Sequence, residues 1–148
     1  MRESMGTFRI DFEIESPFQE GRRAVVRHAL VDTGAESSWV PAPILESLGI
    51  PRKKTMRFRQ ANGDILERWL GPASFYVNGI WTADEVVFGE PGDLVLLGAR
   101  TLEGLNLRVD PRSKTLVDAG PAPAAPVALA VRIRSRGAAE GAEGRVSA

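Results

Sequence analysis

The sequence predicts a small, mostly β domain with one or two short helices. Apolar side chains alternate with charged ones from Phe8 to Glu15, which is the period-two pattern of a strand with one face in water. Asn-Gly pairs at Asn62-Gly63 and Asn78-Gly79 each separate two segments of extended character. Asn-Gly is the strongest short-range signal for a β-hairpin, because both residues tolerate the positive φ of a type I′ turn. The middle of the chain is therefore predicted to be strand and turn.

The other elements follow from turn signals and spacing. Ile44, Leu45 and Leu48 recur at helical spacing, with prolines near the start and Gly49 just past the end, which predicts a short helix. The segment 24–31 is interpreted as a strand that returns from a turn at 17–22. The predicted hairpins have their strands at residues 56–60 and 65–69, 74–77 and 80–88, and 105–109 and 114–117.

Length and composition are those of one domain followed by a tail. With 148 residues, 43% hydrophobic and 26% charged, the chain can bury roughly two-thirds of its unfolded surface. Residues 1–118 are assigned to this domain. Residues 119–148 are rich in Pro, Ala, Gly and Arg, offer little surface to bury, and are expected to be a disordered tail. A basic run at 132–136 is interpreted as a solvated part of this tail, with a nucleic-acid site as the alternative.

The composition also excludes several classes of function. Lys plus Arg and Asp plus Glu number 19 each, so global charge favours neither nucleic acid nor a membrane surface as a partner. The absence of cysteine excludes disulfides, thiol nucleophiles and the usual structural zinc sites. The single histidine, His28, is interpreted as an ordinary strand side chain, and we expect neither a metal nor a cofactor. No apolar run approaches the ~20 residues that cross a bilayer and no hydrophobic signal segment is visible, so a cytoplasmic location is expected.

The most informative segment is Ala29–Ala35, in which an apolar run delivers one carboxylate onto a tight turn. Asp32 lies where the predicted strand leaves the core, so desolvation can act on it. The hydroxyl of Thr33 can hydrogen-bond to neighbouring backbone and fix the turn. Gly34 has no Cβ, so its backbone can adopt a positive φ and a ligand or a second chain can approach closely. The small side chain of Ala35 keeps the floor of the predicted site narrow. This placement predicts a catalytic acid. An ordinary strand-ending turn is the alternative, because Asp, Thr and Gly are all common turn residues.

A second signature, Leu96-Leu97-Gly98, ends an apolar run and precedes a predicted short helix at 100–103. With the Asp-Thr-Gly-Ala turn before it, the chain from about Phe8 to Val117 resembles the retropepsin-like aspartic proteases, the single-domain, retroviral-type family. The resemblance implies a small closed β-barrel-like fold with a flap hairpin over the substrate. The flap would have its tip at Ala61, Asn62 and Gly63, and a plain surface hairpin is the alternative. Candidate pocket residues are Trp39, the hairpin from Met56 to Trp69, and Val95 to Leu97.

The number of suitable aspartates predicts the assembly. Aspartic proteolysis uses two carboxylates that share a proton, because like charges about 3 Å apart do not both ionise. Asp118-Ala119-Gly120 echoes the catalytic turn, but it lacks Thr or Ser and a proline-alanine segment follows it. The second carboxylate is therefore expected to be Asp32 of another copy, in a C2 homodimer. The resemblance implies an aspartic endopeptidase in which this dyad activates a water to hydrolyse a peptide or protein substrate. The alternative is a non-catalytic dimerisation or peptide-binding module on the same fold.

The sequence departs from the retroviral pattern in two places. In retroviral members, an arginine directly after the late glycine pairs with an acidic residue just beyond the catalytic turn. Here Ala99 follows the glycine and Arg100 comes one place late, while Glu36 holds the acidic position, so Glu36 and Arg100 are a candidate buttress pair. Residues after Val117 offer no clear counterpart of the retroviral strand that interleaves at the dimer interface. These departures motivate the non-catalytic alternative.

Overall fold

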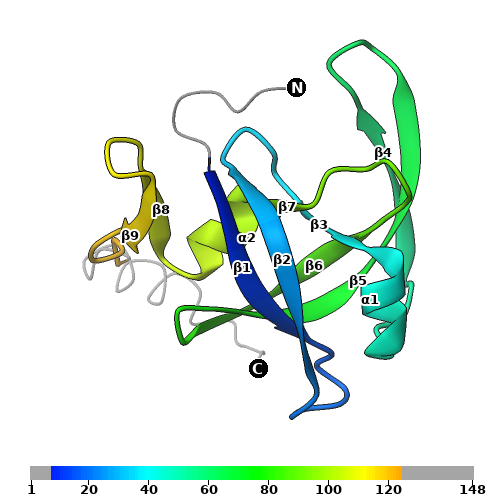
Figure 1. The fold of residues 1–148 in the computed structure, drawn as a ribbon, viewed down its shortest axis with the longest axis horizontal. Helices are drawn as coiled ribbons and strands as arrows, with labels where there is room; N and C mark the ends of the chain where they lie inside the picture. Colours follow the sequence, from blue (N-terminus) through cyan, green and yellow to red (C-terminus); the bar gives the residue numbers. More distant parts are fainter. Residues whose placement is uncertain (1–7, 125–148) are drawn as a thin grey trace, which may run out of the picture.

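Nine strands and two short helices make up the regular structure of residues 8–124, the part of the chain that the computed structural model describes (Figure 1). The elements in chain order are β1 (Phe8–Glu15), β2 (Arg23–Asp32), β3 (Ser38–Pro41), α1 (Ala42–Ser47), β4 (Lys54–Arg59), β5 (Ile65–Val77), β6 (Ile80–Gly89), β7 (Leu96–Gly98), α2 (Ala99–Gly104), β8 (Leu107–Asp110) and β9 (Thr115–Asp118). Most of the predicted tail, including the basic run at 132–136, lies outside the described residues. Within these residues no helix is long and apolar enough to cross a membrane.

Six strands close into a barrel. The main sheet has the order β1-β2-β7-β3-β6-β5-β4, and β1 also pairs with β5. This closing contact is antiparallel and runs from Glu13 opposite Tyr76 to Glu15 opposite Ser74. β4 lies outside the ring at the sheet edge, and β8 and β9 form a separate two-stranded sheet. The predicted mostly β, closed barrel with short helices is therefore confirmed.

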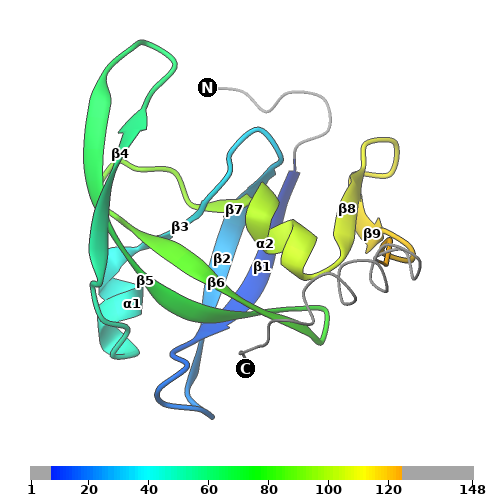
Figure 2. The same cartoon turned by 180° about the vertical axis from the view of Figure 1, so that it is seen from behind.

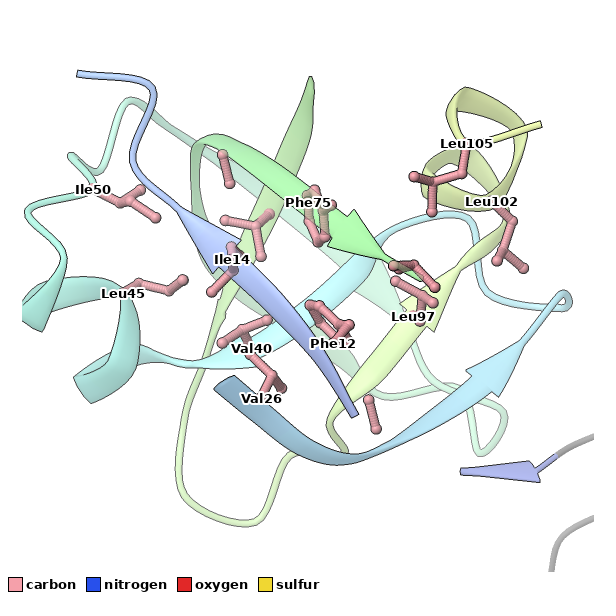
Figure 3. Close-up of a cluster of buried hydrophobic side chains, with 14 of the residues drawn as sticks. Phe12, Ile14, Val26, Val40, Leu45, Ile50, Phe75, Leu97, Leu102 and Leu105 are labelled. Carbon is pink, nitrogen blue, oxygen red and sulfur yellow. The ribbon is translucent and has the colours of Figure 1, made fainter. Parts of the chain in front are cut away.

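Side chains from most strands and both helices fill the barrel (Figure 3). Phe12 and Ile14 are buried while Asp11 is exposed and Glu13 half-buried, as the alternation in the sequence predicts. The rings of Phe12 and Phe75 lie with their centroids 5.7 Å apart at the centre of this core. Core side chains outside β1 include Val26, Val40, Leu45, Leu48, Ile50, Phe75, Phe88, Leu97, Leu102 and Leu105. The core thus anchors β2 and β7, the two strands that carry the predicted motifs.

The outer elements lie on opposite sides of this barrel. The β4–β5 hairpin extends on one side, and α2 with the β8–β9 hairpin lies on the other, as both views show (Figures 1 and 2). α1 follows β3 directly and buries Leu45 against the core, as the helical spacing predicts. Gly49, just past this helix, has a φ of 74°, so the glycine permits the turn that ends it.

A β-bulge interrupts the pairing of β1 with β2. Arg27 and His28 together face the single residue Asp11, because the register shifts between Ile10 and Phe12. His28 has a φ of 56°, and its backbone N–H donates to Oδ1 of Asp11 over 2.9 Å. His28 is a strand residue of β2 with an exposed side chain, as interpreted from the sequence, but the bulge interrupts the regular alternation there.

Only one of the two Asn-Gly hairpins has the predicted type I′ turn. Asn78 and Gly79 both have positive φ, 51° and 80°, in a tight turn. In the first hairpin Gly63 has a φ of 95° but Asn62 is not among the residues with positive φ. Gln60 pairs with Asp64 around a loop of residues 61–63, and the side-chain oxygen of Asn62 accepts the N–H of Asp64 over 2.9 Å. The predicted hairpin is confirmed. The predicted type I′ turn is wrong, because this side-chain hydrogen bond stabilises a longer loop.

Candidate active site

Asp32 is the last residue of β2, and its carboxylate is oriented by the turn that follows. The backbone N–H of Gly34 donates to Oδ1 of Asp32 over 2.9 Å, and the N–H of Ala35 donates to the Asp32 carbonyl over 3.2 Å. Asp32 is half-buried, while Thr33 and Gly34 are exposed. Gly34 does not adopt the positive φ considered for it, but a Cβ there would lie 3.2 Å from Oδ1 of Asp32. Its lack of a side chain therefore keeps the approach to the carboxylate open.

The fold brings the two predicted motifs together. β2 and β7 pair in parallel, with Asp32 facing Gly98 in register. The N–H of Ala99 donates to the carbonyl of Ala35 over 2.7 Å, so the start of α2 is bonded directly to the turn. A Cβ on Gly98 would lie only 2.5 Å from the carbonyl oxygen of Ser37, which explains why this position has no side chain. The Asp-Thr-Gly-Ala turn and the Leu-Leu-Gly segment thus form one packed unit.

Within the chain, Arg100 does not form the predicted ion pair with Glu36. The backbone N–H of Arg100 donates to the Glu36 carbonyl over 3.1 Å. Its guanidinium lies instead 3.4 Å from Oδ1 of Asp84 and 3.5 Å from Oε1 of Glu85. The contact between the candidate buttress residues is therefore a backbone contact. The displacement of the arginine by one place into α2 directs its side chain to β6, where both acidic partners lie.

A buried chain of hydrogen bonds below the turn was not predicted from the sequence. The N–H of Gly98 donates to Oγ of Ser38 over 2.9 Å. Oγ of Ser38 lies 2.6 Å from Oγ1 of Thr101, which donates to Oδ2 of Asp84 over 2.8 Å. Because Thr101 has a single hydroxyl proton and donates it to Asp84, Ser38 donates to Thr101. Both hydroxyl residues are fully buried, so these bonds fix β3, β7, α2 and β6 relative to one another.

A pocket of about 420 Å³ opens beside the turn, with Gly34 and Ala35 on one side and the β4–β5 hairpin on the other. Its apolar wall is formed by Trp39, Phe58, Leu66, Leu94 and Leu96. The rings of Trp39 and Phe58 are in contact, with centroids 4.9 Å apart. Trp39, the hairpin and Leu96 were candidate pocket residues and do line the pocket, whereas Leu97 is fully buried in the core.

The hairpin carries its candidate flap residues at its tip. Ala61, Asn62 and Gly63 form the exposed loop between β4 and β5, and the pocket is lined by residues nearer the barrel, including Phe58 and Leu66. Among residues 8–124, no group of three or more His, Asp or Glu side chains is arranged to hold a metal ion.

A nearly buried ion pair joins this hairpin to the far side of the pocket. Nε of Arg68 lies 2.8 Å from Oδ2 of Asp93, and Nη2 of Arg68 lies 3.0 Å from Oδ1, so the contact is bidentate. Each side chain is only 12% exposed. The hydrogen bonds from Arg68 hold the pKa of Asp93 below its ordinary value despite partial burial, and the pKa of Arg68 is raised in turn. The sequence gives no local signal for this pair, because its members are 25 residues apart.

Comparisons with known proteins found a matching family model and similar solved structures. The family model described as "gag-polyprotein putative aspartyl protease" matches residues 22–104, which is more than half of the 148-residue chain. The solution structure of the simian foamy virus (mac) protease matches with 24% identity and a TM-score of 0.42, over 63% of this chain and 91% of that one. The foamy viral protease-reverse transcriptase in complex with an RNA/DNA hybrid matches with 16% identity and a TM-score of 0.43, over 64% of this chain and 12% of that one. No curated protein matches the sequence.

Proposed function

The chain belongs to the retroviral-type aspartyl protease family, and on that premise we propose that it is a homodimeric aspartic endopeptidase. The observation that carries the proposal is the carboxylate of Asp32. It is oriented by the N–H of Gly34, directly follows the buried residues Ala29 to Val31 of β2, and stands beside a pocket with an apolar wall. A carboxylate placed in this way is suited to move a proton next to a bound peptide.

The second carboxylate of the dyad comes from Asp32 of another copy. Asp93, which also lines the pocket, is bound through both oxygens by Arg68 and is not free to share a proton. Asp118, in the sequence that echoes the catalytic turn, ends β9 in the separate two-stranded sheet. A C2 axis between two Asp32 side chains supplies the missing group with no further residue.

In the proposed mechanism, the two Asp32 carboxylates share one proton and hold a water between them. One carboxylate removes a proton from the water while the other protonates the oxygen of the scissile carbonyl, so no covalent intermediate forms. The dyad titrates as a pair, with apparent pKa values that belong to neither residue alone. The bond from Gly34 to Oδ1 orients each carboxylate for this exchange.

The substrate lies extended between the turn and the β4–β5 hairpin, which acts as the flap. An extended peptide in such a groove pairs through its backbone, and alternate side chains enter pockets. In each copy the pocket beside Gly34 and Ala35 receives one of these side chains against the rings of Trp39 and Phe58.

The test is cleavage of an unbiased peptide library over an acidic-to-neutral pH series, with sedimentation analysis of the same samples. We expect cleavage by a dimer, inhibition by a statine-type transition-state mimic, and complete loss of cleavage in Asp32→Asn with the dimer intact. Asp118→Asn is the matched control, because Oδ1 of Asp118 accepts the N–H of Gly120 over 2.8 Å, in the same local geometry as Asp32 and Gly34. Cleavage that persists in Asp32→Asn, or a strictly monomeric active protein, contradicts the proposal.

A non-catalytic peptide-binding or dimerisation module is the second candidate. It is favoured by the pairing of Arg100 with Asp84 and Glu85, which leaves the retroviral buttress unformed within the chain. This candidate predicts that the wild-type chain binds the statine-type peptide but cleaves nothing in the library, and that Asp32→Asn leaves binding unchanged.

A further inference from the structure

Part of the β4–β5 hairpin extends beyond the barrel. β5 pairs with β6 only from Leu70 to Val77, so the segment from Ile65 to Trp69 is paired with β4 alone. We call residues 55–69 the hairpin arm, which projects from the barrel in Figure 1. Sheet hydrogen bonds hold the arm together but do not fix its angle to the pocket. Apart from the continuity of β5 with the barrel, side-chain contacts therefore set its position.

Arg68 makes the strongest of these contacts. Residues two apart on a strand share a face, so Arg68 lies on the same face as Leu66, which lines the pocket. At the base of the arm, its planar guanidinium binds both oxygens of Asp93. A bidentate pair of this kind fixes orientation as well as distance, and with 12% exposure it is little screened by solvent.

Asp93 is itself held rigidly. Its Oδ2 accepts the N–H of Glu90 over 2.7 Å, and its own N–H donates to the Glu90 carbonyl over 2.9 Å, so the loop before β7 is closed on itself. Two residues later, the carbonyl of Val95 accepts the N–H of Leu30 in β2 over 2.8 Å. The ion pair therefore links the arm to the strand that ends at Asp32.

We propose that Arg68 and Asp93 form a latch that holds the hairpin arm over the pocket and sets the width of the groove. Opening of the hairpin is then confined to the residues beyond Arg68, which include Phe58, Leu66 and the tip. Both latch residues are positioning residues, because they act through the placement of the arm. The effect of the latch on catalysis rests on the proposed function, whereas its effect on the position of the arm does not.

The position of the arm can be measured directly, because the chain has no cysteine. Two cysteines are introduced for spin labelling, by Ala61→Cys at the tip of the hairpin and Glu103→Cys in α2. The labelled full chain is diluted into excess unlabelled chain, and pulsed electron paramagnetic resonance measures the distance between the two labels. We expect a narrow distance distribution in the reference variant Lys54→Met, which keeps the Arg68–Asp93 pair, and a clearly broader one in Arg68→Met and Asp93→Asn. Lys54 is the matched control, since its 2.8 Å pair with Glu85 also joins the hairpin to the barrel but is 51% and 39% exposed. Equal widths in Arg68→Met and Lys54→Met overturn the latch.

Circular dichroism melting shows whether each variant folds. If Arg68→Met does not fold, Arg68→Lys decides the question, because lysine keeps the charge and loses the fork. For Arg68→Lys we expect a distribution of label distances broader than that of the labelled chain with Arg68. An unchanged width overturns the proposal.

Kinetics on a peptide that the wild type cleaves test the groove. We expect KM to rise about tenfold in Arg68→Met, which corresponds to about 1.4 kcal/mol, with a smaller change in kcat. If Arg68 has only a structural role, the substitution lowers the fraction of active protein, so the apparent kcat falls while KM stays constant. That result contradicts the latch. If the wild type cleaves no peptide, the proposed function fails while the distance distributions still decide the latch.

Discussion

Asp32 and Gly98 face each other in the parallel ladder between β2 and β7, at the point where both strands end. The backbone of Gly98 also packs against the turn, because a Cβ added there would meet the carbonyl oxygens of Ser37 and Glu36 at 2.5 and 2.9 Å. The geometry of the turn that carries Asp32 therefore depends on a residue that has no side chain of its own.

Gly98→Ala is expected to displace the turn and to lower the free energy of unfolding by about 1–3 kcal/mol, the usual cost of overpacking. The backbone carbonyls it meets cannot rotate away as a flexible side chain would. Gly89→Ala is the control, because the nearest atom to its Cβ, the carbonyl oxygen of Val40, is 3.2 Å away. Urea denaturation checks the difference, and equal losses in the two variants contradict this account of Gly98.

Thr101→Val is expected to lower the free energy of unfolding by about 1–3 kcal/mol, because it leaves Ser38 and Asp84 without their shared partner. Thr115→Val is the matched control. The hydroxyl of Thr115 lies 2.7 Å from that of Ser113 at the surface, so Thr115→Val is expected to change the free energy of unfolding by no more than about 0.5 kcal/mol. Thermal or urea unfolding measures both, and the account of the buried hydroxyls is wrong if the two variants lose the same stability.

Tyr76→Phe is expected to destabilise the protein in a pH-dependent way. The hydroxyl of Tyr76 donates over 2.7 Å to the buried carboxylate of Glu15, and this bond, with that from the N–H of Gly21, holds the pKa of Glu15 below its ordinary value. A carboxylate with a lowered folded pKa contributes stability above its unfolded pKa of about 4.3, and this contribution is lost as the pH falls through the folded value.

The difference in unfolding free energy between wild type and Tyr76→Phe is therefore expected to be about 1–3 kcal/mol near neutral pH and to shrink below about pH 4. Urea denaturation at a series of pH values measures it. Glu13→Gln is the control, because the ion pair of Glu13 with Arg23 is about half exposed and contributes at most about 1 kcal/mol. A difference that stays constant with pH contradicts the assignment to Glu15.

The sequence predicted those features that depend on neighbouring residues. The alternation from Phe8 predicted β1, and Asn78-Gly79 predicted its turn type, because both signals are complete within a few positions. The resemblance identified the segments of Asp32 and Gly98 as signatures, but their pairing was not predicted, since a parallel pair leaves no local trace of which strands meet.

Features that depend on tertiary placement were missed or misplaced. Ser38 and Thr101 are 63 residues apart, and nothing local marks either hydroxyl as buried. The direction of Arg100 depends on where α2 begins, which periodicity predicts only to within a residue or two. The bulge at His28 was not predicted, because a bulge adds one residue to a strand without changing its composition.

The closing contact between β1 and β5 bears on how far the protein can be shortened. The residues that match the family model begin at 22, after β1 has ended at Glu15. A version trimmed to that match would lack β1, so the barrel would be open and β2 and β5 would have unpaired edges. Unpaired strand edges can pair with other molecules and cause aggregation. The smallest stable version therefore has to include all of β1, from Phe8 to Glu15, although the recognisable signatures of the family start later.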